Sequence, residues 1–172
     1  QLKFKNLEGS RDFTTPPSCV VGKDSFKSMG VDFADLNRDG VPDLAVSNIA
    51  VPNGLMESNF IWLSDGTTNE MLAGKAPYKQ AADRLGLARS GWAWDCRMAD
   101  FNNDGTDEVM YATGFIKGDT NRWPEVQSVG SINSALLSDP HNWPRFTTKD
   151  DVSGREKNTF YALSANGKYV DI

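Results

Sequence analysis

The feature that most constrains this chain is an internal repeat built around two acidic segments. Residues 28–49 read SMGVDFADLNRDGVPDLAVSNI, and residues 93–114 read AWDCRMADFNNDGTDEVMYATG. Placing Asp100 over Asp35 aligns DFNNDGTDE with DLNRDGVPD at an offset of 65 residues, and apolar positions agree on both sides. A period of this length is typical of an array of four-stranded units joined by loops.

Short segments of alternating polarity surround the acidic segments and predict β-strands. Val31, Phe33 and Asp35 fall on one face of a strand, because strand side chains alternate with a period of two. The segments 60–66 (FIWLSDG) and 160–167 (FYALSANG) each read as a strand followed by a glycine turn, which is the signal for a hairpin. The chain is therefore predicted to be all-β.

The order of these segments predicts a partial β-propeller of about two and a half four-stranded blades. Residues 1–172 would form one propeller segment, with a first blade at about 1–57 and a second at about 58–115. Residues 158–172 would open a third blade. Residues 115–157 break the pattern and are expected to form an insertion with a short helix.

Two short helices are expected outside the strands. Residues 75–87 (KAPYKQAADRLGL) favour a helix that ends at Gly86, because glycine adopts the left-handed conformation that closes a helix. Within the insertion, Pro124 is expected to start a helix, and Pro140 and Pro144 to close it.

Each acidic segment places oxygen-bearing groups at alternate positions, which is the arrangement that a hard cation requires. Calcium takes six to eight oxygen ligands, and a tight loop supplies them from alternate residues. Gly40 and Gly105, at position six, permit a sharp turn with positive φ. The expected calcium ligands at positions one, three, five, seven (backbone carbonyl) and nine are Asp35, Asn37, Asp39, Val41 and Asp43, and Asp100, Asn102, Asp104, Thr106 and Glu108.

Two other interpretations of the acidic segments compete with calcium binding by strand-flanked loops. An EF-hand needs an acid at position twelve and helices on both sides, but position twelve is Val46 or Tyr111 and the flanks are strand-like. An Asx turn without metal is also compatible with Asp, Asn and Gly. Two copies with the same ligand types favour metal binding, and the sequence predicts two calcium ions.

The two acidic segments, with apolar strands before and after, resemble the FG-GAP or VCBS repeats of bacterial exported proteins and of integrin α-chain propellers. The segments GWAWDCRMADFNNDG and NTFYALSANGKYVDI resemble in particular bacterial members related to the ASPIC/UnbV group. The resemblance implies a β-propeller with calcium in the loop between the first two strands of each blade, held by the ten positions given above. The literal phenylalanine-glycine and glycine-alanine-proline signatures are absent, so the integrin comparison supports the fold more than adhesion.

Composition and motifs argue against several classes of protein. The net charge is −5, which provides no electrostatic footprint for nucleic acid. No stretch approaches the roughly 18 apolar residues of a membrane-spanning helix. His141 is the only histidine, so a His-rich zinc site is excluded, and no GxSxG motif presents a serine nucleophile. We therefore expect a non-catalytic protein.

The expected function is binding or scaffolding in an exported protein. Closed propellers have roughly four to eight blades, so the partner is expected to be another protein or the remaining blades of a larger chain, and carbohydrate is a further candidate. The alternatives are a propeller part of a secreted hydrolase or lyase, and a structural subunit of a membrane-associated complex. Calcium sites of extracellular modules bind at about 10⁻⁴–10⁻³ M, so an extracellular or periplasmic location is expected.

Two residue pairs carry further expectations. Cys19 and Cys96 are compatible with one disulfide bridge or with two small buried thiols, and the sequence leaves both open. Asp32 and Arg97 occupy equivalent positions in the repeat, and we expect them to pair with each other across adjacent blades.

Overall fold

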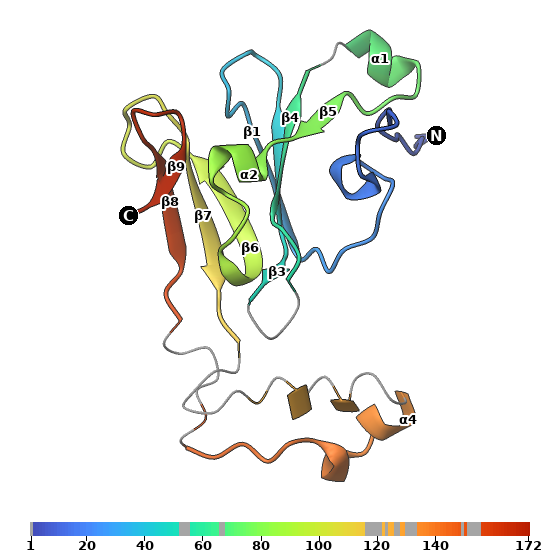
Figure 1. Ribbon diagram of the computed structural model, residues 1–172, viewed down its shortest axis with the longest axis vertical. Helices are drawn as coiled ribbons and strands as arrows, with labels where there is room; N and C mark the ends of the chain where they lie inside the picture. The colour runs from blue at the N-terminus through green and yellow to red at the C-terminus, as the bar shows by residue number, and fades with distance from the viewer. Residues whose placement is uncertain are drawn as a thin grey trace.

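Two antiparallel sheets make up most of the protein, which is described here by a computed structural model (Figure 1). The structure describes residues 2–51, 56–65, 68–115, 122, 124–125, 128–129, 134–148, 150 and 156–172. The strands are β1 (Gly30–Ala34), β2 (Asp43–Ser47), β3 (Ile49–Ala50), β4 (Phe60–Ser64), β5 (Tyr78–Gln80), β6 (Gly91–Ala99), β7 (Glu108–Thr113), β8 (Thr159–Leu163) and β9 (Tyr169–Asp171). The predicted all-β class is confirmed.

The first sheet has the order β1-β2-β4-β5, and neighbouring strands are antiparallel. Side chains of the central strand β2 alternate between buried and half-buried, with Asp43, Ala45 and Ser47 on the buried side. Ala45 lies opposite Asp32 in β1 and Ile61 in β4. The period-two pattern of the sequence therefore appears in β2 as one buried and one half-buried side.

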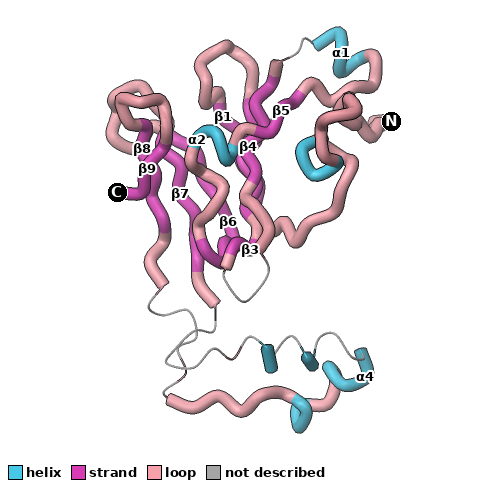
Figure 2. Tube along the Cα trace, in the orientation of Figure 1, coloured by secondary structure: helices cyan, strands magenta, loops and turns pink. Residues whose placement is uncertain are grey.

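The second sheet has the order β3-β6-β7-β8-β9. The short strand β3 follows β2 in the chain but pairs with β6, where Ile49 lies opposite Trp92 and Ala50 opposite Gly91. The remaining strands, β6 to β9, form a second antiparallel series of four. Figure 2 shows the strands of both sheets standing beside one another, with the loops at their ends.

The helices and helical turns are short and lie before the first strand, between strands or in the insertion. They are α1 (Thr68–Leu72), α2 (Ala82–Leu85), α4 (Ser134–Leu137) and the 3-10 turns η1 (Pro17–Cys19) and η2 (Pro140–Asn142). Helix α2 ends at Gly86, whose φ is 82°, as the sequence predicts, but it begins only at Ala82 because residues 78–80 form β5. Pro124 and Glu125 are helical, and most of 116–133 lies outside the described residues.

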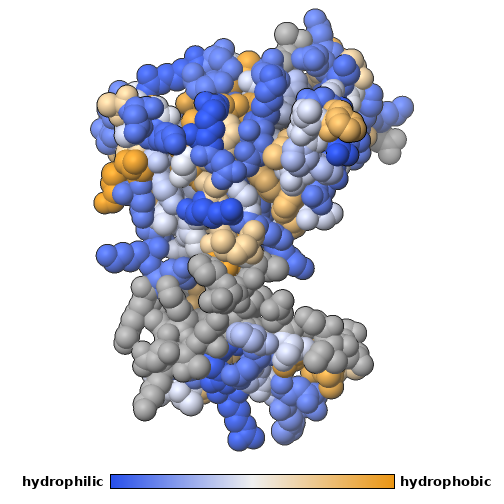
Figure 3. Space-filling view, in the orientation of Figure 1, coloured by the Kyte–Doolittle hydropathy of each residue, from blue (hydrophilic) through white to orange (hydrophobic). Residues whose placement is uncertain are grey.

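One hydrophobic cluster joins the two sheets. Ala45 and Ile61 of the first sheet, Val109 and Tyr111 of the second, and Leu87 from the segment between them have no exposed surface. Burying a large apolar side chain contributes about 1.5–3 kcal/mol, so this cluster is the main stabilising contact between the sheets. On the face seen in Figure 3, the described surface over the sheets is largely hydrophilic, with small apolar areas.

The strand pairing differs from the division into units that the repeat predicts. Phe60 and Phe160 were expected to begin new blades. In the structure β4 pairs with β2, and β8 pairs with β7, so each of these strands continues the sheet that precedes it. A repeating series of strands does not show where a unit starts, and the preference of sequential strands for pairing with each other decides the grouping.

The expected pair of Asp32 with Arg97 does not form. Arg97 instead contacts Asp95 of its own strand at 2.9 Å. Asp32 does cross between the sheets, but its Oδ2 accepts a hydrogen bond from the backbone N–H of Met98 in β6 at 2.8 Å. The prediction identified a strand-to-strand contact and assigned the wrong partner, because β1 approaches β6 closely enough for a short aspartate to reach the main chain.

The two cysteines are free, with Cys19 exposed and Cys96 buried. The structure therefore excludes the disulfide bridge between them. It agrees only in part with the alternative of two buried thiols, because Cys96 alone is buried. Its Sγ contacts the backbone carbonyl of Ala45 at 3.5 Å. Burial raises the pKa of the Cys96 thiol to about 12.

None of the helices in the described residues has the length and apolar character needed to span a membrane.

The environments of the thiols predict different reactivities. We expect an aromatic disulfide reagent at mildly alkaline pH to modify Cys19 rapidly in the native protein and Cys96 only after unfolding, because the thiolate is the reactive form and the raised pKa keeps Cys96 protonated. The Cys19→Ser variant should show almost no native reactivity and one reactive thiol in urea. A native protein without any reactive thiol before or after unfolding would indicate a bridge.

Candidate metal centres

The first acidic loop (residues 35–43) runs from the end of β1 to the start of β2 and is closed by its own side chains. The two carboxylate oxygens of Asp35 accept hydrogen bonds from the backbone N–H of Asp39 at 2.9 Å and of Gly40 at 2.8 Å. The side-chain oxygen of Asn37 accepts from the same Asp39 N–H at 3.0 Å. Positions one and three therefore direct oxygen atoms toward one point of the turn.

The second acidic loop (residues 100–108) runs from the end of β6 to β7 and repeats these contacts. Asp100 accepts from the N–H groups of Asp104 at 2.9 Å and Gly105 at 2.8 Å. Asn102 accepts from the Asp104 N–H at 2.7 Å. The hydrogen bonds that the side-chain oxygens of Asp35 and Asn37 accept in the first loop thus have equivalents in the second.

Backbone conformation is also the same in the two loops. Gly40 and Gly105, at position six, have φ values of 86° and 83°, as their residue type predicts. Position four is left-handed as well, with φ of 61° at Arg38 and 59° at Asn103. Asparagine tolerates this conformation, whereas arginine seldom adopts it, so the residue types at position four do not predict the left-handed turn in both loops.

The acid at position nine lies beneath each turn. Asp43 has no exposed surface, and its carboxylate accepts from the backbone N–H groups of Leu36 at 3.0 Å, Asn37 at 3.3 Å and Ser64 at 2.8 Å. Asp43 thereby ties the loop to β4. Burial raises the pKa of Asp43, although these N–H donors act in the opposite direction, because removal from water disfavours the ionised form.

Glu108 has a similar position in the second loop. It is 2% exposed, and its Oε2 accepts from the N–H of Phe101 at 3.0 Å. Its Oε1 accepts from the side-chain amide of Asn102 at 2.9 Å. The longer side chain reaches across its own loop, whereas Asp43 also reaches the next strand.

An arginine joins the two loops. The Nη2 of Arg38, in the first loop, donates a hydrogen bond to the hydroxyl of Thr106 in the second. The pKa of Asp104 is lowered, mainly by the Asn102 side chain and to a smaller extent by Arg38. Figure 1 shows both loops at the same end of the two sheets. Sequence reasoning missed this role of Arg38, because it depends on the adjacency of segments 68 residues apart.

The predicted ligands of each loop are of the chemical type that a hard cation binds. All the predicted ligands offer oxygen atoms, which calcium prefers, and positions one and three converge within each turn. Positions five and seven form a local contact, because the N–H of Val41 donates to Asp39 at 2.9 Å and that of Thr106 to Asp104 at 2.8 Å. In the described part of the chain, no three His, Cys, Asp or Glu side chains are grouped closely enough to hold a metal.

His141 lies away from both loops in η2. Its ring is exposed, and its Nδ1 contacts Asp139 at 2.9 Å. The same carboxylate accepts from the His141 backbone N–H at 3.0 Å, so the contact is a local cap of η2.

The buried position-nine acid predicts unequal effects of substitution within one loop. We expect Asp43→Ala to lower the free energy of unfolding by about 2–4 kcal/mol, because it leaves buried N–H groups without an acceptor. Asp39→Ala, at an exposed position, should cost less than about 1 kcal/mol. Urea unfolding in the presence of chelator measures both, and equal losses would contradict the anchoring role of Asp43.

Comparison with known proteins identifies no relative whose function could be carried over to the two loops. No family model, curated protein or solved structure matches the chain. The function is therefore inferred from the geometry of the loops and sheets.

Proposed function

We propose that this chain is a calcium-binding β-propeller segment that serves binding or scaffolding in an exported protein. The observation that carries the proposal is the agreement between the two acidic loops. Each has the same hydrogen bonds from positions one, three and five, and the same left-handed positions four and six. Each also joins the first two strands of a series of four antiparallel strands.

Calcium would be held by the oxygen atoms of the ten residues predicted from the sequence. Bound there, the ion would supply positive charge that offsets the carboxylates of each turn. Asp43 supports this interpretation, because burial raises its pKa and a nearby cation would favour its ionised form. The chain's own residues orient the loop, since backbone N–H groups already hold the Asp35 and Asp43 carboxylates in place.

The two inner strands, β1 and β6, differ in how far their side chains are buried, and this difference supports a propeller arrangement with additional blades. Cys96 and Met98 in β6 face the first sheet and are 1% and 6% exposed. Their equivalents in the repeat, Val31 and Phe33 in β1, are 52% and 62% exposed. Asp32, on the other face of β1, contacts the second sheet. The face carrying Val31 and Phe33 is therefore where a preceding blade or a partner chain would pack.

A scaffolding role agrees with this uncovered strand face. A contiguous exposed apolar patch marks an interaction site more often than isolated apolar residues do. The calcium requirement supports an extracellular or periplasmic location, where calcium reaches the concentrations at which such loops bind.

Calcium titration tests the metal sites directly. We expect calorimetry to detect two ions per chain, and one ion in either Asp35→Asn or Asp100→Asn. At a free calcium concentration ten times Kd, two occupied sites add about 2.8 kcal/mol to the free energy of unfolding. This raises Tm by roughly 5–10 °C. Asp24→Asn, which changes an exposed acid outside the loops, is the matched control and should keep both ions. The absence of any heat or Tm shift at millimolar calcium would overturn the metal proposal.

The uncovered face of β1 predicts concentration-dependent association of this chain. We expect the double variant Val31→Asp and Phe33→Asp to weaken self-association in sedimentation velocity while the unfolding free energy changes by less than about 1 kcal/mol. Phe13→Asp, at a fully exposed phenylalanine, is the control and should leave association unchanged. A monomeric native chain at all concentrations would contradict this role of the face.

A further inference from the structure

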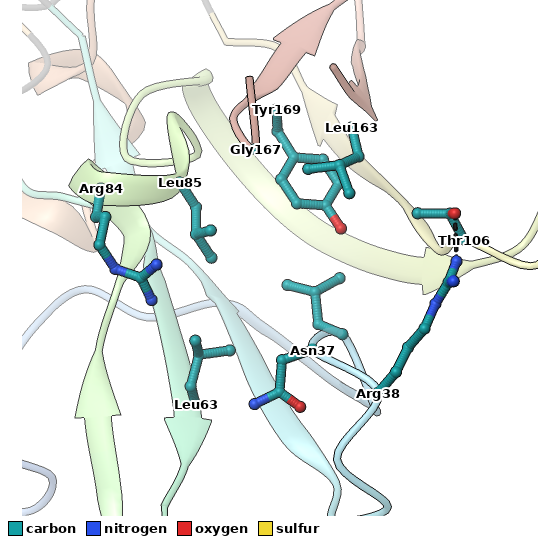
Figure 4. A pocket seen from close by; sticks show the side chains of 10 residues that line it. Asn37, Arg38, Leu63, Arg84, Leu85, Thr106, Leu163, Gly167 and Tyr169 are labelled. Carbon is teal, nitrogen blue, oxygen red and sulfur yellow. Dashed lines mark hydrogen bonds between the residues drawn. The ribbon is translucent and has the colours of Figure 1, made fainter. Parts of the chain in front are cut away.

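A cavity of about 450 Å³ lies where the two sheets meet, beside both acidic loops (Figure 4). Its wall combines residues from the first loop, β4, α2, the second loop and the β8–β9 hairpin, none of which the sequence places together. The lining residues that bear on a ligand are Leu36, Arg38, Leu63, Arg84, Leu85 and Tyr169. The volume lies within the range of roughly 300–1,000 Å³ found for small-molecule sites.

Much of the wall is apolar and fixed by packing. Leu36 and Tyr169 are 9% and 4% exposed, and Leu63 and Leu85 pack against the hydrophobic cluster. The hydroxyl of Tyr169 donates to the backbone carbonyl of Asp107 at 3.1 Å. This hydrogen bond uses the hydroxyl proton, so the ring rather than a free donor is presented to the cavity. Such a wall suits the apolar body of a ligand.

The charged groups of the wall are both arginines. Figure 4 shows Arg84 and Arg38 on opposite sides of the apolar residues, with the Arg38 guanidinium extended toward Thr106. No aspartate or glutamate is among the described residues that line the cavity. The positive charge on two sides disfavours a cationic ligand and favours an anion.

The two arginines differ in how much of their charge is already compensated. Arg38 donates to Thr106 and acts on the carboxylates of Asp104 and Asp107. The Arg84 side chain is exposed, and it makes no hydrogen bond or ion pair with any part of the chain that the structure describes. Its guanidinium has five N–H donors in a planar fork that matches a carboxylate. Arg84 is therefore the main candidate for an anion contact.

We infer that this cavity binds a small organic carboxylate, with its charged group at Arg84 and its apolar body against Leu85, Leu63 and Tyr169. A neutral ligand would gain no charge-assisted contact with the exposed Arg84 guanidinium, and an inorganic anion would leave the apolar wall uncovered. Asn37 and Thr106 of the wall are also proposed calcium ligands. The residues assigned to the carboxylate, Arg84, Leu85, Leu63 and Tyr169, are not, so the inference does not rest on the calcium sites. Its test is therefore carried out in the presence of a chelator.

The test uses three probes of one shape and different charge. Isothermal titration of the full chain with phenylpropanoate, phenylpropanol and phenylpropylamine should give the tightest binding for the carboxylate, by about tenfold over the alcohol. Arg84→Gln should abolish this preference, and Arg84→Glu should reverse it in favour of the amine. Arg11→Gln, which changes an exposed arginine outside the cavity, is the matched control.

A second variant tests the apolar part of the site without altering charge. Leu163→Trp, at a 44% exposed position of the wall, should weaken the carboxylate and the alcohol together by narrowing the cavity. Equal binding of the carboxylate and the alcohol to the native chain would overturn the inference. So would a carboxylate preference that survives Arg84→Gln, or the absence of carboxylate binding at about 10 mM.

Discussion

The packing of β6 against the first sheet is the contact on which the rest of the structure depends. Cys96 and Met98 insert toward β1 and β2, and Asp32 reaches the Met98 N–H. The close approach also requires Gly30, because a Cβ there would lie 2.6 Å from Asp95 Cα. A larger side chain at this position would separate the inner strands and open the buried cluster that joins the sheets.

This contact places the two acidic loops together. Each loop follows the end of an inner strand, so bringing β1 beside β6 brings residue 38 beside residue 106. Arg38 can then join the loops through Thr106, and the space left between the loops, α2 and the β8–β9 hairpin becomes the cavity. The proposed metal sites and the proposed ligand site thus share one structural cause, and they meet at Asn37 and Thr106, which belong to the loops and to the cavity wall.

Each acidic loop combines an exposed rim with a buried anchor. Asp35, Asn37 and Asp39 arrange the turn near its surface, whereas Asp43 ties it to β4 from a position without exposed surface. In the proposed metal site the rim would respond to a cation while the anchor keeps the loop in register with the sheet. The exposed Val31 and Phe33 are a different kind of surface, whose apolar character suits another blade or chain rather than an ion.

The sequence by itself determined the strands that flank the acidic loops, the glycine turns and the positions of these loops, because these depend on local alternation and backbone preference. It placed residues 78–80 in a helix, where the structure has β5. Gly40, Gly86 and Gly105 have the positive φ that their positions predict. The tertiary structure alone decided that β4 and β8 continue the preceding sheets, that Asp32 contacts Met98 rather than Arg97, and that Arg84 and Tyr169 line one cavity. These features depend on packing between residues distant in the chain, which no local pattern records.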